Sequence, residues 1–170
     1  MIKLNIDTFK KRFPQFGEAL NANELQSLIE LLKIQIVEAS EALIVEGTET
    51  NALYFVWEGE LDVLLNGPEG EHKVASVETG DLLGEISLLS PNKTTATIRS
   101  QLGCIALHLD AESLETFWDK YPHAASKFLQ ILSRIIAQRT RNVVELLESL
   151  QNDTAMNSDL DDAQEALLKG

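Results

Sequence analysis

Residues 83–98 have the sequence LGEISLLSPNKTTATI, and more can be inferred from this stretch than from any other part of the chain. Gly84 and Glu85 lead into a short apolar segment, a turn that contains proline, and a β-branched run from Thr94 to Ile98. This order suits a loop whose backbone N–H groups converge on an anion while one carboxylate accepts a hydrogen bond from a hydroxyl group. The stretch therefore predicts a site for a ligand that carries both an anionic group and a hydroxyl.

The sequence on both sides of this stretch predicts a β-sheet. From Ile34 to Asp110, short runs of β-branched and aromatic residues are broken by Gly, Asn and Pro. These runs predict strands over residues 34–37, 42–45, 52–58, 60–65, 72–77, 95–100 and 105–109, with a hairpin loop at 66–70. Many short strands at close spacing favour a sandwich or a jelly-roll barrel over a parallel sheet.

Helices are predicted before the strands. Leucine and isoleucine at helical spacing predict a helix over residues 21–33, with Asn21 or Asn23 as its N-cap. Another helical segment is predicted over residues 6–20, interrupted at Pro14 and Gly17.

A long helix is predicted over residues 123–150. One apolar seam has alternating four- and three-residue steps, as in a coiled coil, and consists of Ala125, Leu129, Leu132, Ile136, Arg139, Val143, Leu146 and Leu150. A second stripe, Phe128, Ile131 and Ile135, could pack onto the strands. The two stripes favour a homodimer through this helix; the alternative is that both belong to an intramolecular core. From Gln151 onward the chain is acidic and is predicted to be a mobile tail.

The overall composition is that of an ordinary globular protein. The 170 residues are 44% hydrophobic and 24% charged, and the formal net charge is −13. This charge argues against a nucleic-acid-binding surface and against docking on an anionic membrane. No apolar run is long enough to cross a bilayer and no signal segment follows Met1, while Cys104 is the single cysteine. We therefore expect a cytoplasmic protein with a buried, inert thiol.

The stretch at 83–98 resembles the phosphate-binding cassette of cyclic nucleotide-binding domains. The resemblance runs from about Leu25 to Leu150 and includes Glu46-Gly47, the aromatic strand Tyr54–Leu61 with its Gly59, and Gly80-Asp81 before the cassette. It implies a mainly β fold: a jelly-roll (double-stranded β-helix, cupin-like) barrel with N-terminal helices and a long C-terminal helix. The domains expected are an N-terminal helical segment (1–20), a cyclic nucleotide-binding-like domain (21–150) whose helix 122–150 dimerises, and an acidic flexible tail (151–170).

The resemblance also implies a set of ligand-binding residues. Glu85, after Gly84, would accept a hydrogen bond from the ribose 2′-hydroxyl, and the backbone N–H groups of Ile86 and Ser87 would point at the cyclic phosphate. The alternative is that Glu85 only stabilises the start of a short helix. Gly84, Glu85, Ile86 and Ser87 are therefore candidate ligand-binding residues.

The sequence departs from the family pattern at one position. Thr94 stands where the family has its phosphate-binding arginine, nine residues after Glu85. Thr94 and Thr95 offer hydroxyl and N–H groups but no charge, and the adjacent Lys93 is expected on the exposed loop. Loss of one charge-assisted contact is expected to cost about 1.5–3 kcal/mol, or roughly 10- to 150-fold in affinity.

Two further candidates lie on the long helix. An ungapped overlay from Pro122 onto the bacterial catabolite activator places its two base-capping positions at Arg139 and Thr140. Arg139 also interrupts the apolar seam, where a buried unpaired charge is costly. It could pair with a ligand, pair with an acid across a dimer, or extend to water.

The sequence leaves three candidate functions. The first is a non-enzymatic cytoplasmic sensor that binds cAMP or cGMP between barrel and C-terminal helix, with a protein partner and without nucleic acid or membrane. The second is a ligand-free relative that serves as a dimerisation or docking module. The third is an enzyme on the related cupin barrel, but His72, His108 and His123 lack the close histidine pair of that fold. We expect no catalytic residue, no metal site and no cofactor beyond a candidate cyclic nucleotide ligand.

Overall fold

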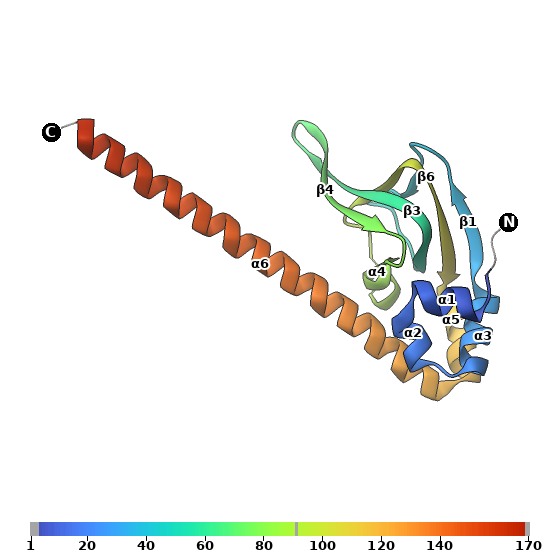
Figure 1. Cartoon of the computed structure of the whole chain (residues 1–170). Coiled ribbons are helices and arrows are strands. Elements are labelled where there is room, and N and C mark those ends of the chain that lie inside the picture. The colour runs from blue at the N-terminus through green and yellow to red at the C-terminus, as the bar shows by residue number, and fades with distance from the viewer. Residues whose placement is uncertain (1–3, 91, 169–170) are drawn as a thin grey trace. The chain divides into compact units, whose positions relative to one another are not determined.

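The computed structural model describes residues 4–90 and 92–168, with the side chains of 4–90, 92–145, 147 and 148. It divides into two units, Met1–Leu132 and Ser133–Gly170. In the first unit, four helices gather at one end of a β-sheet: α1 (Ile6–Arg12), α2 (Pro14–Ala19), α3 (Ala22–Leu31) and α5 (Ala111–Lys120) (Figure 1). A fifth, short helix is α4 (Glu85–Leu89), and the long helix α6 spans Pro122–Leu168.

The sheet is antiparallel throughout the described strands. Its strands are β1 (Lys33–Val37), β2 (Ala42–Ile44), β3 (Ala52–Gly67), β4 (Gly70–Glu78), β5 (Leu82–Leu83) and β6 (Thr97–Asp110). They follow the order β1-β6-β3-β4, with β2 also on β6 and β5 also on β3. The mainly β class with N-terminal helices and a long C-terminal helix is confirmed.

The described strands do not close into a barrel, which corrects one part of the expected architecture. β1 and β4 are the two ends of the strand path. All residues of β4 except Val77 are exposed, as is typical of an edge strand. Without a ladder that joins its two ends, the sheet stays open.

Two pairs of predicted strands are single long strands in the structure. β3 passes through Gly59 and β6 passes through Gly103, where the sequence analysis placed breaks. Gly59 has φ +104°, and a Cβ atom there would lie 2.9 Å from the Gly103 carbonyl oxygen. Glycine therefore allows the two backbones to approach closely while the strands twist past the bulges, rather than ending the strands.

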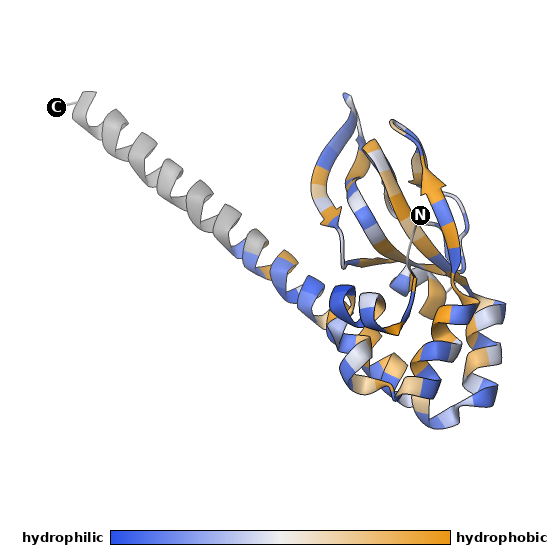
Figure 2. Cartoon of the chain, turned by 45° about the vertical axis from the view of Figure 1, so that its right-hand side comes forward, coloured by the Kyte–Doolittle hydropathy of each residue, from blue (hydrophilic) through white to orange (hydrophobic). Residues whose placement is uncertain are grey.

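The two faces of β3 belong to different parts of the core. Side chains alternate along a strand, so Ala52, Tyr54 and Val56 share one face. They belong to a buried cluster with Val37, Leu43, Ile44, Leu61, Val77, Leu83, Ile98, Cys104 and Ala106. On the other face, the Phe55 ring lies 5.6, 5.1 and 5.3 Å from the rings of Phe9, Phe13 and Phe16 on the N-terminal segment. Figure 2 shows the hydrophobic residues along the strands and on the packed helices.

The N-terminal helices form much as the sequence predicts. Asn21 caps α3, because its side chain accepts hydrogen bonds from the N–H groups of Asn23 and Glu24. The predicted interruption at Pro14 is the boundary between α1 and α2, whereas Gly17 lies inside α2. Helices α1 and α2 bury Phe9 and Phe16 in the core of the first unit. Each buried ring contributes about 1.5–3 kcal/mol to stability.

Helix α6 extends beyond its predicted end. Its backbone is helical to Leu168, where the sequence analysis ended the helix at Leu150. Within the first unit, Phe128 of the second stripe is fully buried, and its ring lies 5.2 Å from that of Phe16. The side chains of residues 150–170 lie outside the described residues, and the mobility of the acidic tail stays a prediction.

Candidate functional site

The cassette starts at a glycine that no other residue can replace without a clash. Gly84 is the N-cap of α4 and has φ +83°. A Cβ atom at this position would lie 2.2 Å from the carbonyl oxygen of Ala52 on β3. The close approach to β3 and the left-handed backbone both require glycine, and together they fix where α4 begins.

Glu85 is the buried acid of the cassette. It is the first residue of α4, and its exposure is 3%. Burial of a carboxylate is tolerated only where polar groups compensate for lost hydration. The first hydrogen bond of α4 joins the N–H of Leu88 to the Gly84 carbonyl, so the earlier N–H groups, including those of Ile86 and Ser87, have no acceptor within the helix. Ile86 is 62% exposed and Ser87 is half-buried.

Thr94 is tied to the turn at residues 45–48. Its hydroxyl donates to the Val45 carbonyl oxygen at 2.6 Å, and its backbone N–H donates to the Thr48 carbonyl oxygen at 2.8 Å. Its own carbonyl accepts from the Gly47 N–H at 2.9 Å. Both donors that the sequence analysis assigned to a phosphate are thus engaged with this turn. Thr95 is exposed, and the role of both threonines as ligand-binding residues stays a prediction.

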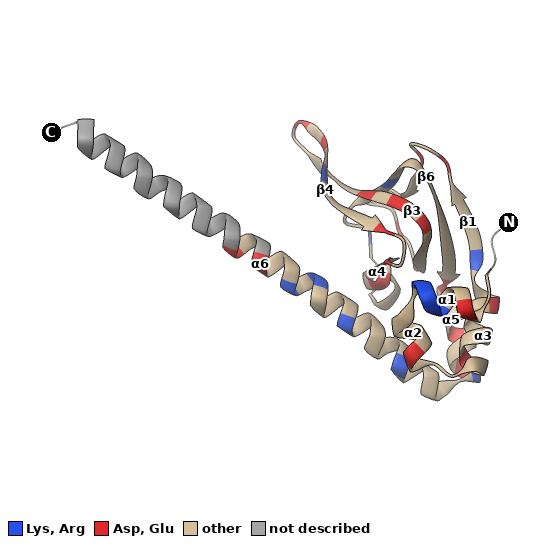
Figure 3. Cartoon of the chain, viewed as in Figure 1, with Lys and Arg blue, Asp and Glu red and all other residues tan. Residues whose placement is uncertain are grey.

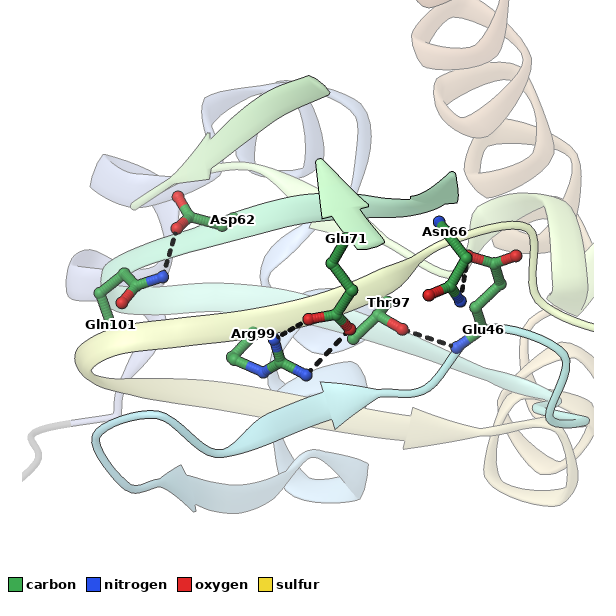
Figure 4. A network of polar contacts seen from close by, with 7 residues as sticks. All are labelled: Glu46, Asp62, Asn66, Glu71, Thr97, Arg99 and Gln101. Carbon is green, nitrogen blue, oxygen red and sulfur yellow. Dashed lines mark hydrogen bonds and ion pairs between the residues drawn. The ribbon is translucent and has the colours of Figure 1, made fainter. Parts of the chain in front are cut away.

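Arg99 is the nearest arginine after the cassette, but it does not replace the family arginine. It follows Ile98, which belongs to the core cluster, so its side chain leaves β6 on the opposite face. Its guanidinium forms two hydrogen bonds with Glu71 on β4, Nη1–Oε2 at 2.5 Å and Nη2–Oε1 at 3.1 Å (Figure 4). These bonds hold the pKa of Glu71 below its ordinary value. The pairing of Arg99 with Glu71 therefore links β6 to β4 within the sheet.

A polar network that the sequence analysis missed surrounds this pair. The Glu46 N–H donates to the Thr97 hydroxyl at 3.0 Å, and the Glu46 carboxylate accepts from the backbone and side-chain nitrogens of Asn66, each at 3.0 Å (Figure 4). These bonds connect the 45–48 turn with β6 and with the β3–β4 hairpin. The cassette end at Thr94 thus rests on a turn that is itself fixed on two sides.

Asp62 belongs to the same group of polar residues on the sheet (Figure 4). Its carboxylate lies 2.5 Å from the Lys73 ammonium and accepts from the Gln101 amide at 2.8 Å. The bond from Lys73, followed by that from Gln101, lowers the pKa of Asp62. The two-residue spacing of charges at Glu60 and Asp62, which matches the outward face of a strand, is the sequence signal for this network.

The predicted site residues are divided between the two units of the chain. Gly84, Glu85, Ile86, Ser87, Thr94 and Thr95 belong to the first unit, whereas Arg139 and Thr140 belong to the second. The Thr140 hydroxyl donates to the Ile136 carbonyl of its own helix at 2.9 Å, and Arg139 is half-buried. Their role as base-capping residues stays a prediction.

Histidines and acids do not assemble into a metal site within the described residues. No group of three or more His, Cys, Asp or Glu side chains in that part of the chain could hold a metal ion. His108 instead packs against Tyr54, with ring centroids 5.1 Å apart and ring planes tilted by 47°, and burial lowers the pKa of His108. Among the described helices, none is both long and apolar enough to cross a bilayer.

Comparison with known proteins identifies the family. The sequence model of the cyclic nucleotide-binding domain matches residues 34–121, which include the whole cassette. The chain belongs to the cyclic nucleotide-binding domain family. The fold agrees: the crystal structure of a cyclic nucleotide-binding domain from Methylobacillus flagellatus superimposes with a TM-score of 0.73 at 20% identity, covering 81% of this chain and 80% of that one.

Two relatives are larger proteins. A putative potassium channel protein from Rhodopseudomonas palustris is 30% identical over 121 residues, which are 71% of this chain and 29% of the relative. The cAMP-dependent protein kinase regulatory subunit of Yarrowia lipolytica is 35% identical over 106 residues, 61% of this chain and 28% of the relative. The chain thus spans less than a third of the length of these curated relatives.

Proposed function

We propose that this domain is a non-enzymatic regulatory module that binds a cyclic nucleotide, cAMP or cGMP, at the cassette that begins at Gly84. The observation that supports it most is the buried Glu85 at the start of α4, held in place by the contact between Gly84 and Ala52. In this proposal Glu85 accepts a hydrogen bond from the ribose 2′-hydroxyl. The N–H groups of Ile86 and Ser87 donate to the cyclic phosphate.

The affinity expected for this site is low. Thr94 supplies no cation to the phosphate, and its two donors are engaged with Val45 and Thr48. A phosphate held by backbone N–H groups alone lacks one charge-assisted contact, worth about 1.5–3 kcal/mol. The affinity should therefore be roughly 10- to 150-fold below that of an otherwise identical site with arginine at this position.

Calorimetric titration with cAMP and cGMP, to millimolar ligand, tests the proposal. We expect saturable binding by the natural chain and loss of binding in Glu85→Ala. The matched control is Glu69→Ala, which removes an exposed carboxylate at the tip of the β3–β4 hairpin and should bind as the natural chain does. Equal binding by all three proteins would contradict the role of Glu85.

The second candidate function is a ligand-free dimerisation or docking module. The three hydrogen bonds between Thr94 and the 45–48 turn favour it, because they complete the cassette end without a ligand. For this candidate, titration with cyclic nucleotide should give no heat, and millimolar ligand should leave the melting temperature unchanged. The same titration thus separates the two functions.

In either case we propose that α6 pairs with the α6 of a second copy of the chain. Val143, Val144 and Leu147 are 56%, 47% and 55% exposed, and an apolar stripe of this kind on a helix favours burial against a partner. A nucleotide bound between the strands and α6, with Arg139 and Thr140 at the base, would favour one helix position and so alter this pairing. Sedimentation equilibrium measures the pairing; a monomer at all concentrations would contradict it.

We propose no nucleic-acid or membrane partner, because nucleic acids and anionic membranes repel a protein with a net charge of −13. We propose a cytoplasmic location on the ground of the single cysteine, Cys104. This thiol is buried, and burial raises its pKa to about 11, so it is not a reactive thiolate at neutral pH.

A further inference from the structure

The charges of α6 are segregated along the helix. Its first part carries cations and no acid: Lys127, Arg134, Arg139 and Arg141. From residue 145 to residue 168 it carries acids and no cation: Glu145, Glu148, Asp153, Asp159, Asp161, Asp162 and Glu165. Figure 3 shows the blue cations of the described part giving way to red acids toward its end. Such a helix is a rod with a basic half and an acidic half.

The apolar block of the seam lies at the boundary between these halves. It runs from Val143 to Leu150. Its described seam member, Val143, is 56% exposed, and Leu147, which lies beside the seam, is 55% exposed. Polar seam positions flank the block on each side: Arg139 lies one step before Val143, and Asp153 lies one step after Leu150. The seam is thus charged oppositely at its two ends.

From this pattern we infer that the partner of α6 is a second copy of the same helix in antiparallel orientation, centred on the block Val143–Leu150. This inference rests on the homodimer of the proposed function and specifies its orientation. In a parallel, in-register pair, Arg139 faces the partner's Arg139, and the two acidic halves also face each other. Like charges in a helix seam disfavour that arrangement.

The antiparallel arrangement brings opposite charges together. When Val143 of one helix lies near Leu150 of the other, Arg139 lies within about one helical turn of the second copy's Asp153. Because the pair is symmetric, this contact occurs twice. Arg134 and Arg141 lie on the helix face away from the seam and act only through the longer-range field of the basic half. Seam contacts therefore set the orientation, and the charged halves reinforce it.

Distances between spin labels distinguish the two orientations. In a Cys104→Ser background, a nitroxide is attached to Ser133→Cys or to Glu148→Cys, both at exposed positions of α6. For the antiparallel pair, Ser133 labels should lie about 40 Å or more apart, since about 27 residues at about 1.5 Å each separate them along the axis. For a parallel pair they should lie under about 30 Å apart.

Glu148 is the matched control because it lies near the centre of the block. Its labels should lie under about 30 Å apart in either orientation. A short Glu148 distance with a long Ser133 distance supports the inference. Two short distances overturn the orientation while the homodimer stands, and no dipolar coupling at Glu148 overturns the homodimer itself. The ligand site itself is tested separately, by the loss of calorimetric cyclic nucleotide binding in Glu85→Ala.

A charge swap provides a second test without labels. Arg139→Glu should weaken the ligand-free dimer by roughly 5- to 30-fold, because two symmetry-related attractions become repulsions. Adding Asp153→Lys to Arg139→Glu should restore the dissociation constant to within a few-fold of its original value. A double variant as weak as, or weaker than, Arg139→Glu alone would overturn the antiparallel contact.

Discussion

Replacing Thr94 with arginine is expected to strengthen cyclic nucleotide binding by about 10- to 150-fold, from one charge-assisted contact of about 1.5–3 kcal/mol. The position is suited to the change because Thr94 is held mainly through its backbone. Its N–H bonds Thr48 and its carbonyl bonds Gly47, and neither bond depends on the side chain. An arginine side chain would therefore start from a fixed point at the end of the cassette.

The same substitution removes one side-chain bond. The Thr94 hydroxyl donates to the Val45 carbonyl oxygen at 2.6 Å, and its loss should cost about 0.5–1.5 kcal/mol of folding stability. For a chain of this size, that corresponds to a fall of about 1–6 °C in the melting temperature of the ligand-free protein. Stability and affinity should thus move in opposite directions in Thr94→Arg.

Thr94→Val is the matched control because it removes the same hydroxyl and adds no cation. It should lose as much stability as Thr94→Arg and gain no affinity. Calorimetric titration of the natural chain and both variants with cAMP and cGMP measures the affinities, and thermal unfolding measures the stabilities. The reasoning is refuted if a folded Thr94→Arg binds cyclic nucleotide no more tightly than Thr94→Val.

Three further predictions concern stability. Gly84→Ala should destabilise the fold by more than about 2 kcal/mol, because the new Cβ atom would clash with the Ala52 carbonyl. Gly47→Ala is the control: Gly47 has φ +79° and open space around it, so the substitution should cost only about 1–2 kcal/mol. Urea unfolding measures both free energies. Asp110→Ala should cost about 0.5–2 kcal/mol in the same assay, because Asp110 caps α5, and Asp110→Asn should cost less. The pKa of Asp62 is lowered on folding, so its stabilisation is complete above about pH 4 and disappears as the pH falls through the folded-state pKa. Asp62→Asn should therefore flatten the acid limb of the stability–pH curve; an unchanged limb would contradict this.

Local sequence signals predicted the parts of the fold that depend on local chemistry. Asn21 caps α3 because its short side chain reaches the N–H groups that follow. Pro14 is the first residue of α2, a position where the backbone N–H that proline lacks would have no acceptor within the helix. The cassette was located because Gly84 and Glu85 form a pattern within a few residues. These features involve neighbours in sequence, so a single sequence contains them.

Long-range pairing was not predictable in the same way. Gly59 and Gly103 interrupt the apolar alternation, which suggested strand ends, but both lie inside continuous strands, where Gly59 pairs with Cys104, next to Gly103. The hydrogen bond from the Thr94 hydroxyl to the Val45 carbonyl oxygen joins residues that are 49 positions apart in the sequence. Whether the sheet is open or closed likewise depends on which strands pair with one another. These facts depend on tertiary register, which hydrophobic periodicity alone does not specify.

The most direct test of the central claim compares cAMP with 2′-deoxy-cAMP on the natural chain and on Glu85→Ala. If Glu85 accepts a hydrogen bond from the ribose 2′-hydroxyl, removal of that hydroxyl should weaken binding to the natural chain by roughly 10- to 150-fold. It should leave binding to Glu85→Ala nearly unchanged, because the acceptor is already gone. An equal loss of affinity in both proteins, or no loss in the natural chain, would contradict the assignment of Glu85.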